Sequence, residues 1–350
     1  MTVCIAAICQ NGNIFGASDR MMTSGDIEFE PKLDSIAKPE LPSPVGLAFN
    51  SNAKIFALTT SIVVMTAGDS GLQSEIVQDL LSVVNSMIQQ DKTHWLSVKE
   101  VTDLYIEAYD RAKSRRSQKT IFAPFNLNAT TFLDQSNKIA SHIVAEITKQ
   151  IQRFESYFRD AHRIEAIITG VDTSIGSIGE NLPSAHIYSV VKSVNGDFVT
   201  CCDSVGFAAV GSGARHAESQ FMLAGHSPFS SQPETLLLTY LAKKRAEVAP
   251  GVGKGTDMFA IGPALGSFAM LKNIPDFDMK TIETIYEKVE KGQESVFQTG
   301  MKEVKDYITN LFKTRLDKQL KTQIEQETQL RASAPPVEVY KPIEKKDENK

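Results

Sequence analysis

An almost continuous apolar run opens the chain, and an Asn-Gly pair follows it directly. Residues 2–10 are rich in Ile, Val, Ala and Cys, which predicts a buried strand. Asn11-Gly12 is typical of a tight hairpin turn, and residues 13–18 return as a second strand. The chain therefore opens on a predicted β-hairpin whose first strand begins close to the N-terminus.

Beyond the hairpin, clusters of strands alternate with clusters of helices. Apolar residues at helical spacing predict helices over residues 72–90, 97–116, 135–161, 233–248 and from Gly211-Ser212-Gly213 to about 223. Further strands are predicted over residues 54–58, 61–67, 164–169, 185–192, 197–202, 207–210, 257–261 and 267–271. Residues 31–53 hold four prolines and are predicted to form a loop.

This order of elements predicts an α+β fold with two antiparallel sheets between layers of helices. A doubly wound parallel sheet would need strict alternation of strands and helices, and the sequence lacks it. Residues 276–331 are helical in pattern and strongly charged. Residues 333–350 are rich in Pro, Lys and Glu, and we expect a disordered tail there.

Composition narrows the classes of partner. The 350 residues include 37 Lys+Arg and 42 Asp+Glu, a formal net charge of −5, which disfavours nucleic acid as a partner. The apolar runs are shorter than the roughly 20 residues of a membrane span, so no membrane contact is expected. The first residues lack a basic leader, so we expect a cytoplasmic protein. The four cysteines form no metal-binding spacing, and we expect no metal or cofactor.

Thr2 has the most distinctive chemistry in the sequence. A methionine followed by a small residue is usually removed, which would leave Thr2 with a free α-amine beside its own hydroxyl. Such a pair is a compact nucleophile and base. The alternative is that Thr2 is an ordinary residue near the start of the chain.

Four segments carry a resemblance that favours the first interpretation. They are TVCIAAICQNGNIFGASDRMMTSGD (residues 2–26), KIFALTTSIVVMTAGDSG (54–71), HIYSVVKSVNGDFVTCCDSVGFAAVGSGARHAESQF (186–221) and GKGTDMFAIG (253–262). Together they resemble the proteasome β-type family of N-terminal-nucleophile hydrolases. The likeness covers most of residues 2–68 and 163–262, is weaker over 72–160 and ends near 275.

The resemblance implies a four-layer αββα N-terminal-nucleophile domain over residues 2–275. In it, residues 72–160 form a helical insertion, 276–332 a helical extension and 333–350 the tail. It also implies that Thr2 is the nucleophile, with Lys54 lowering the pKa of the α-amine and Asp19 orienting Lys54. The hairpin is one residue longer than is usual in the family, which places Asp19 one position later. Without the resemblance, Asp19-Arg20 could be a surface ion pair and Lys54 a solvated residue at the start of a strand.

Four more residues match the family in part. Gly68 corresponds to the oxyanion glycine, Thr23 to a threonine that binds substrate backbone, and Ser212 to an accessory active-site serine. The family's second aspartate has no direct counterpart, and Glu247 is the nearest acid that could replace it. Taken alone, Gly68 could simply be needed for the turn into the next helix.

We therefore expect a threonine-type peptidase or amidohydrolase that forms an acyl-enzyme on Thr2. Its substrate would be a peptide or protein, and by resemblance the chain would assemble into a homo-oligomer or ring. Two alternatives stay open. One is a non-catalytic, proteasome-like assembly subunit, and the other is a non-proteolytic amidase of the same superfamily that acts on small amides.

Overall fold

The architecture was obtained as a computed structural model. It describes residues 2–24, 27–29, 54–91, 95–135, 138–157, 164–172, 184–193, 196–263 and 269–332. The predicted loop over residues 31–53 and the predicted tail over 333–350 lie outside these ranges.

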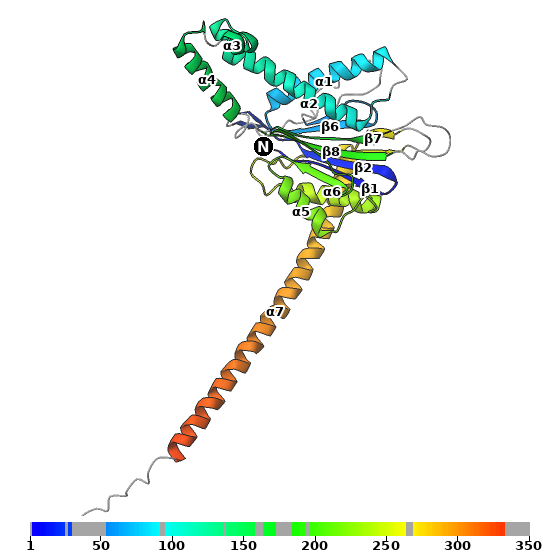
Figure 1. The fold of residues 1–350 in the computed structure, drawn as a ribbon. Helices are drawn as coiled ribbons and strands as arrows, with labels where there is room; N and C mark the ends of the chain where they lie inside the picture. The colour runs from blue at the N-terminus through cyan, green and yellow to red at the C-terminus, as the bar shows by residue number, and fades with distance from the viewer. Residues whose placement is uncertain are drawn as a thin grey trace, which may run out of the picture. The chain divides into compact units, whose positions relative to one another are not determined.

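The described residues form a mixed α+β fold with two five-stranded antiparallel sheets (Figure 1). The first sheet has the order β10-β1-β2-β11-β12, made of Phe207–Val210, Cys4–Cys9, Asn13–Asp19, Thr256–Pro263 and Ala269–Asn273. The second has the order β5-β6-β7-β8-β9, made of Ile55–Ala57, Ile62–Ala67, Glu165–Asp172, Ser184–Ser193 and Gly196–Cys201. The predictions of an α+β class and of two antiparallel sheets are confirmed.

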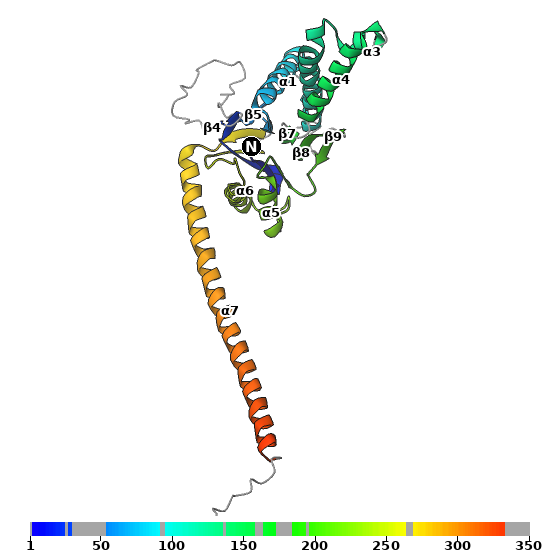
Figure 2. The ribbon, with the colours of Figure 1, turned by 90° about the vertical axis from the view of Figure 1, so that its left-hand side faces the viewer.

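Helices pack on the outer face of each sheet. Of the α-helices in the described residues, α1 (Ser70–Gln90), α2 (Val98–Ser117), α5 (Ala214–Leu223) and α6 (Gln232–Ala246) cover the sheets. The others are α3 (Ala129–Gln135), α4 (Ser141–Ser156) and α7 (Asp276–Ala332). One apolar cluster joins α1 and α2 to the second sheet, and another joins α5 and α6 to the first. A third cluster lies between the sheets. Figure 2 shows α5 and α6 on the opposite side of the strands from α1.

Strand β1 is buried along its whole length because both of its faces meet apolar layers. Cys4, Ala6 and Ile8 contribute to the cluster between the sheets, whereas Ile5 and Ala7 face α5 and α6. This explains why the opening run is apolar at every position instead of alternating. Thr2, two residues before this strand, is also held inside the molecule and is only 3% exposed.

The predicted Asn-Gly turn is confirmed. Asn11 and Gly12 adopt φ values of 63° and 68°, the left-handed backbone that this pair tolerates.

Capping groups fix the starts of two helices. Asp69 accepts a hydrogen bond from the Leu72 amide at the start of α1, and Ser97 forms a capping box with Glu100 at the start of α2.

Three features differ from the prediction. The helix predicted over residues 135–161 is shorter in the structure: α4 covers Ser141–Ser156, and residues 138–140 before it are not α-helical. Helix α3, which ends at Gln135, was not predicted, and the Asn128 side chain caps its start by accepting from the Thr131 amide. A short antiparallel pair, β3 (Met22–Ser24) and β4 (Ile27–Phe29), was not predicted.

The chain divides into two compact units, Met1–Tyr286 and Glu287–Lys350. The first turns of α7 belong to the first unit, because Ile282 and Tyr286 pack beside Tyr240. Arg20 also forms an ion pair with Asp276 at the start of α7, at 2.9 Å.

Within the described residues, none of the helices is both long enough and apolar enough to cross a bilayer.

Candidate active site

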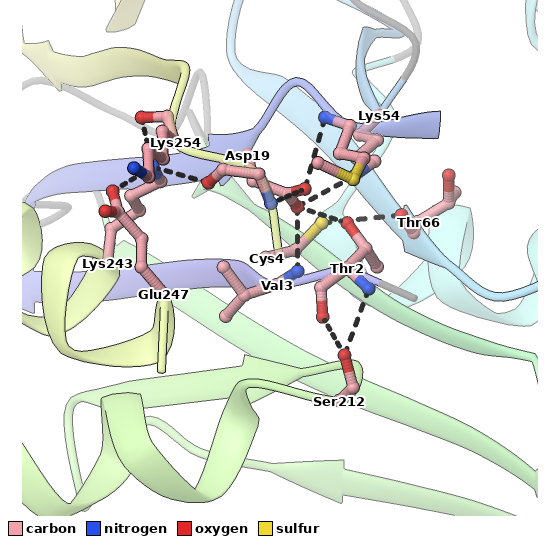
Figure 3. A network of polar contacts seen from close by, with 12 residues as sticks. Thr2, Val3, Cys4, Asp19, Lys54, Thr66, Ser212, Lys243, Glu247 and Lys254 are labelled. Atoms are coloured by element: carbon pink, nitrogen blue, oxygen red, sulfur yellow. Dashed lines mark hydrogen bonds and ion pairs between the residues drawn. The ribbon is translucent and has the colours of Figure 1, made fainter. Parts of the chain in front are cut away.

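The hairpin brings an aspartate directly against Thr2. In the β1–β2 register Cys4 pairs with Ser18, so Asp19 lies beside the start of β1, and its amide donates to the Val3 carbonyl at 3.3 Å. Asp19 Oδ1 accepts hydrogen bonds from Thr2 Oγ1 at 2.5 Å and from the Val3 amide at 2.9 Å (Figure 3). The extra residue in the hairpin therefore does not separate these two side chains.

The Asp19 carboxylate is almost completely enclosed by donors. Oδ1 also accepts from Lys54 Nζ at 2.7 Å, and Oδ2 accepts from the amides of Met21 and Gly253 at 3.2 and 3.0 Å. Asp19 is 1% exposed and Lys54 is 7% exposed. A buried pair of this kind persists only when further hydrogen bonds complete it, which these amides do.

The ion pair joins the two sheets. Asp19 ends β2 in the first sheet, whereas Lys54 immediately precedes β5 in the second. The Lys54 carbonyl accepts from the Thr66 amide, which fixes the start of β5 against β6. Lys54 is therefore buried and paired instead of solvated, and the ion pair that Asp19 forms is not exposed.

Ser212 lies on the other side of Thr2. Its Oγ is 3.2 Å from the Thr2 nitrogen, and the amide of Gly213 donates to the Thr2 carbonyl at 3.3 Å. The turn is held from the second sheet, because the Gly211 amide donates to Glu165 Oε2 at 2.6 Å. Glu165 was not among the predicted site residues.

Gly211 approaches Thr2 so closely that only glycine fits. Its φ is +93°, and a Cβ built there would lie 2.3 Å from the Thr2 carbonyl oxygen. We expect Gly211→Ala to lower the free energy of unfolding by clearly more than the roughly 1–2 kcal/mol of left-handed backbone alone. The measurement is urea unfolding.

Gly225→Ala is the matched control for this prediction. Gly225 also has a left-handed φ of +64°, but nothing lies within 4 Å of its Cβ position. Gly225→Ala should lower the free energy of unfolding by about 1–2 kcal/mol. Equal destabilisation by Gly211→Ala and Gly225→Ala would show that the contact with Thr2 is unimportant.

The structure also places Gly68 and Thr23. Gly68 has a φ of +122° and lies exposed in the turn between β6 and α1, where Gln73 anchors the preceding Ala67 carbonyl at 2.7 Å. Thr23 lies in β3 and pairs with Glu28, and its side chain is outside the described part of the structure. A contact of either residue with substrate stays a prediction.

Glu247 does not approach Thr2. It lies on the other side of Asp19, where its carboxylate is 2.6 Å from Lys243 Nζ and 3.2 Å from Lys244 Nζ (Figure 3). Lys243 is fully buried and also donates to the carbonyls of Gly253 and Lys254, at 2.9 and 2.7 Å. Glu247 therefore acts through a lysine that holds the loop whose Gly253 amide bonds Asp19. Lys243 was not among the predicted site residues.

Removing Lys243 should loosen this loop. Burial lowers the pKa of Lys243, but three acceptors still surround its ammonium. We expect Lys243→Met to cost about 2–5 kcal/mol, since each buried acceptor left unpaired costs about 1–3 kcal/mol. Lys244→Met, next to it and partly exposed, should cost about 1 kcal/mol or less in the same thermal unfolding measurement. Similar losses for the two variants would contradict this role.

The Cys4 thiol, which also lies near Asp19, is unreactive. Cys4 donates its thiol to the Thr66 carbonyl, and burial raises the pKa of this thiol to about 12. At neutral pH it is therefore protonated and a poor nucleophile.

Among the described residues, no group of three or more His, Cys, Asp or Glu side chains could hold a metal ion.

No family model matches the sequence, and no curated protein matches it. The chemistry of the site therefore rests on the contacts described above.

Proposed function

We propose that this chain is an N-terminal-nucleophile hydrolase of the proteasome β type, which cleaves peptide or amide bonds through Thr2. The observation that carries the proposal is a shared contact: one oxygen of Asp19 accepts hydrogen bonds from both the Thr2 hydroxyl and the Lys54 ammonium. The succession of helix pair, two sheets and helix pair supports the proposed four-layer αββα domain.

The proposed reaction begins with removal of Met1, since the Thr2 nitrogen is otherwise a peptide nitrogen. The freed α-amine accepts the proton of Thr2 Oγ as this oxygen attacks the substrate carbonyl carbon. The α-ammonium returns this proton to the substrate nitrogen as the carbon–nitrogen bond breaks, so that the amine leaves and an acyl-enzyme remains. Water then hydrolyses the ester and regenerates Thr2.

Two neighbouring groups affect the protonation and the orientation of the α-amine that acts as the base. An α-amine ordinarily titrates near 7.7–8.0, so much of it is protonated at neutral pH. The Lys54 ammonium, bound to the same Asp19 oxygen as the Thr2 hydroxyl, disfavours a second positive charge on the amine. Ser212 Oγ, 3.2 Å from the Thr2 nitrogen, orients it.

We also propose that the chain acts as a homo-oligomer in the cytoplasm. Large apolar side chains are exposed at the end of α5 and in the segment that follows it: Met222, Leu223 and Phe229 are 67%, 82% and 86% exposed. Such a group is typical of a surface that another chain covers. Light scattering of the purified protein would give its mass in solution.

Substrate class and the covalent intermediate can be tested together. Purified protein is incubated with fluorogenic peptide amides and, separately, with small acyl amides, then quenched in acid and digested. The proposal predicts turnover of peptides and an acyl group on the Thr2 peptide. Turnover of small amides alone would favour the amidase alternative. Absence of both turnover and adduct would favour a non-catalytic assembly subunit.

A further inference from the structure

A second chain of hydrogen-bonded polar side chains lies away from Thr2. It joins Ser184 and His186 of β8 to Asp203, in the turn after β9. His186 Nε2 is 2.8 Å from Ser184 Oγ, and His186 Nδ1 is 2.7 Å from Asp203 Oδ2. Serine, histidine and aspartate in this order are the parts of an activated hydroxyl nucleophile, which is recognised by geometry and not by sequence position.

This group is separate from the site at Thr2. Strand β7 runs between them: Glu165 at one end holds the Gly211 turn beside Thr2, and Asp172 at the other end pairs with Ser184. At about 3.3 Å per residue, the two ends are roughly 23 Å apart.

The surroundings of His186 select the tautomer that a base needs. Asp203 is held by the Ile187 amide, which donates to its Oδ1 at 2.8 Å. The Asp203 carboxylate accepts hydrogen bonds, so Nδ1 carries the proton and the lone pair of Nε2 faces the Ser184 hydroxyl. Ser184 and His186 are two residues apart on one strand and so share a face of the sheet.

A second carboxylate stabilises the product of proton transfer. Asp172 Oδ2 is 3.5 Å from His186 Nε2, and Asp172 is itself fixed by the Val98 amide at the start of α2. When Ser184 gives its proton to Nε2, the imidazolium is flanked by Asp172 and Asp203. Ser184 is exposed and the His186 side chain is 24% exposed, so a small acyl donor can reach both.

We propose that Ser184, His186 and Asp203 form a second nucleophilic site, independent of Thr2, that accepts acyl groups from activated esters and thioesters. Ser184 Oγ attacks the carbonyl carbon, and the bond from this carbon to the leaving oxygen or sulfur breaks. The hydroxyl proton passes to His186 Nε2, and the leaving group departs as an anion or takes this proton. The product is acyl-Ser184, and no oxidant or metal is involved.

The site should become more reactive as the pH rises. The hydrogen bond to Asp203, together with the charges of Asp203 and Asp172, raises the pKa of His186. Tyr188 also lies beside this histidine, with ring centroids 6.4 Å apart, and its own pKa is raised by burial and by neighbouring groups that include Cys201 and both aspartates. Only neutral His186 can accept a proton, so acylation should rise through the raised pKa of His186 and then level off. Asp172→Asn should move this rise to lower pH.

The test uses the full chain carrying Thr2→Ala, so that acylation at Thr2 cannot contribute. The protein is treated with p-nitrophenyl acetate, and acetylation of each serine is followed by mass spectrometry of peptides. Ser74, an exposed serine whose hydroxyl bonds the Ser70 carbonyl, is the internal control in the same sample. We expect Ser184 to acetylate at least about 10²-fold faster than Ser74, the size of a general-base contribution.

Variants assign the roles. His186→Gln and Asp203→Asn should each reduce acetylation of Ser184 to nearly the rate of Ser74, which both variants leave unchanged. Circular dichroism and the unchanged Ser74 rate show whether each variant is folded. Three results would overturn the proposal: a Ser184 rate equal to that of Ser74, a Ser184 rate unchanged by His186→Gln, or stable acetylation of His186 in place of Ser184. None of them bears on hydrolysis at Thr2.

Discussion

Replacing Thr2 by Ala should abolish hydrolysis of any substrate that the wild-type protein cleaves. Alanine keeps the α-amine and permits removal of Met1, but it lacks the oxygen that attacks the carbonyl carbon. Removal of the nucleophile from enzymes that form acyl intermediates lowers kcat by about 10⁴-fold or more, and we expect a loss of that size. The measurement is kcat/KM on a peptide amide.

Thr2→Ser is the matched control, because serine supplies both the hydroxyl and the amine. It should keep measurable turnover and should form the acyl adduct on residue 2. Thr2 makes its side-chain hydrogen bond to Asp19, so both variants need a thermal unfolding curve beside their kinetics. If Thr2→Ala keeps more than about a hundredth of the wild-type rate, Thr2 is not the nucleophile.

Replacing Asp19 by Asn should have the second-largest effect, on stability as well as on activity. The carboxylate accepts three hydrogen bonds at Oδ1 and two at Oδ2, and asparagine has only one oxygen to offer. It also leaves the Lys54 ammonium buried without its charged partner. Loss of one member of a buried pair costs about 3–5 kcal/mol, and we expect this loss in the free energy of unfolding.

A double variant separates the two effects. Asp19→Asn combined with Lys54→Met removes the unpaired cation, so much of the stability should return. Activity should not return, because neither the orienting carboxylate nor the ammonium that adjusts the amine is present. Unfolding in urea and kcat/KM are measured on the single and double variants. Full activity in the folded double variant would show that this pair serves the fold alone.

The part of the site that lies within the hairpin could be predicted from the sequence. The Asn-Gly turn fixes the register of two adjacent strands, and this register places Asp19 beside the start of β1. Lys54 is different, since it comes from the other sheet, and no local pattern in the chain says which sheet faces which. Only the family resemblance indicated Lys54 as a site residue, and the same is true of Ser212.

The residues that sequence reasoning missed act through tertiary contacts. Glu165 begins a buried strand and bonds a backbone amide 46 positions away, which no spacing rule reveals. Lys243 and Glu247 stand at i and i+4 on a helix, a pattern that ordinarily means a solvated ion pair. The spacing alone therefore did not show which group Glu247 supports. Its partner is buried, and the pair supports the loop beside Asp19.

The second hydroxyl site illustrates the same limit. The predicted strand over residues 185–192 includes His186 but not Ser184, which lies on the same strand only in the structure, where β8 begins at Ser184. Asp203 follows a different strand and meets His186 only through the β8–β9 pairing. The sequence therefore gave no reason to connect the three residues.

The most direct measurement of the central proposal is the mass of the intact purified protein, with fragmentation of its N-terminal peptide. We predict a polypeptide that begins at Thr2 with an unmodified α-amine, because only then do the attacking hydroxyl and its base lie on one residue. A chain that retains Met1, or whose Thr2 nitrogen is acetylated, would contradict this prediction and leave the Asp19–Lys54 pair a structural element.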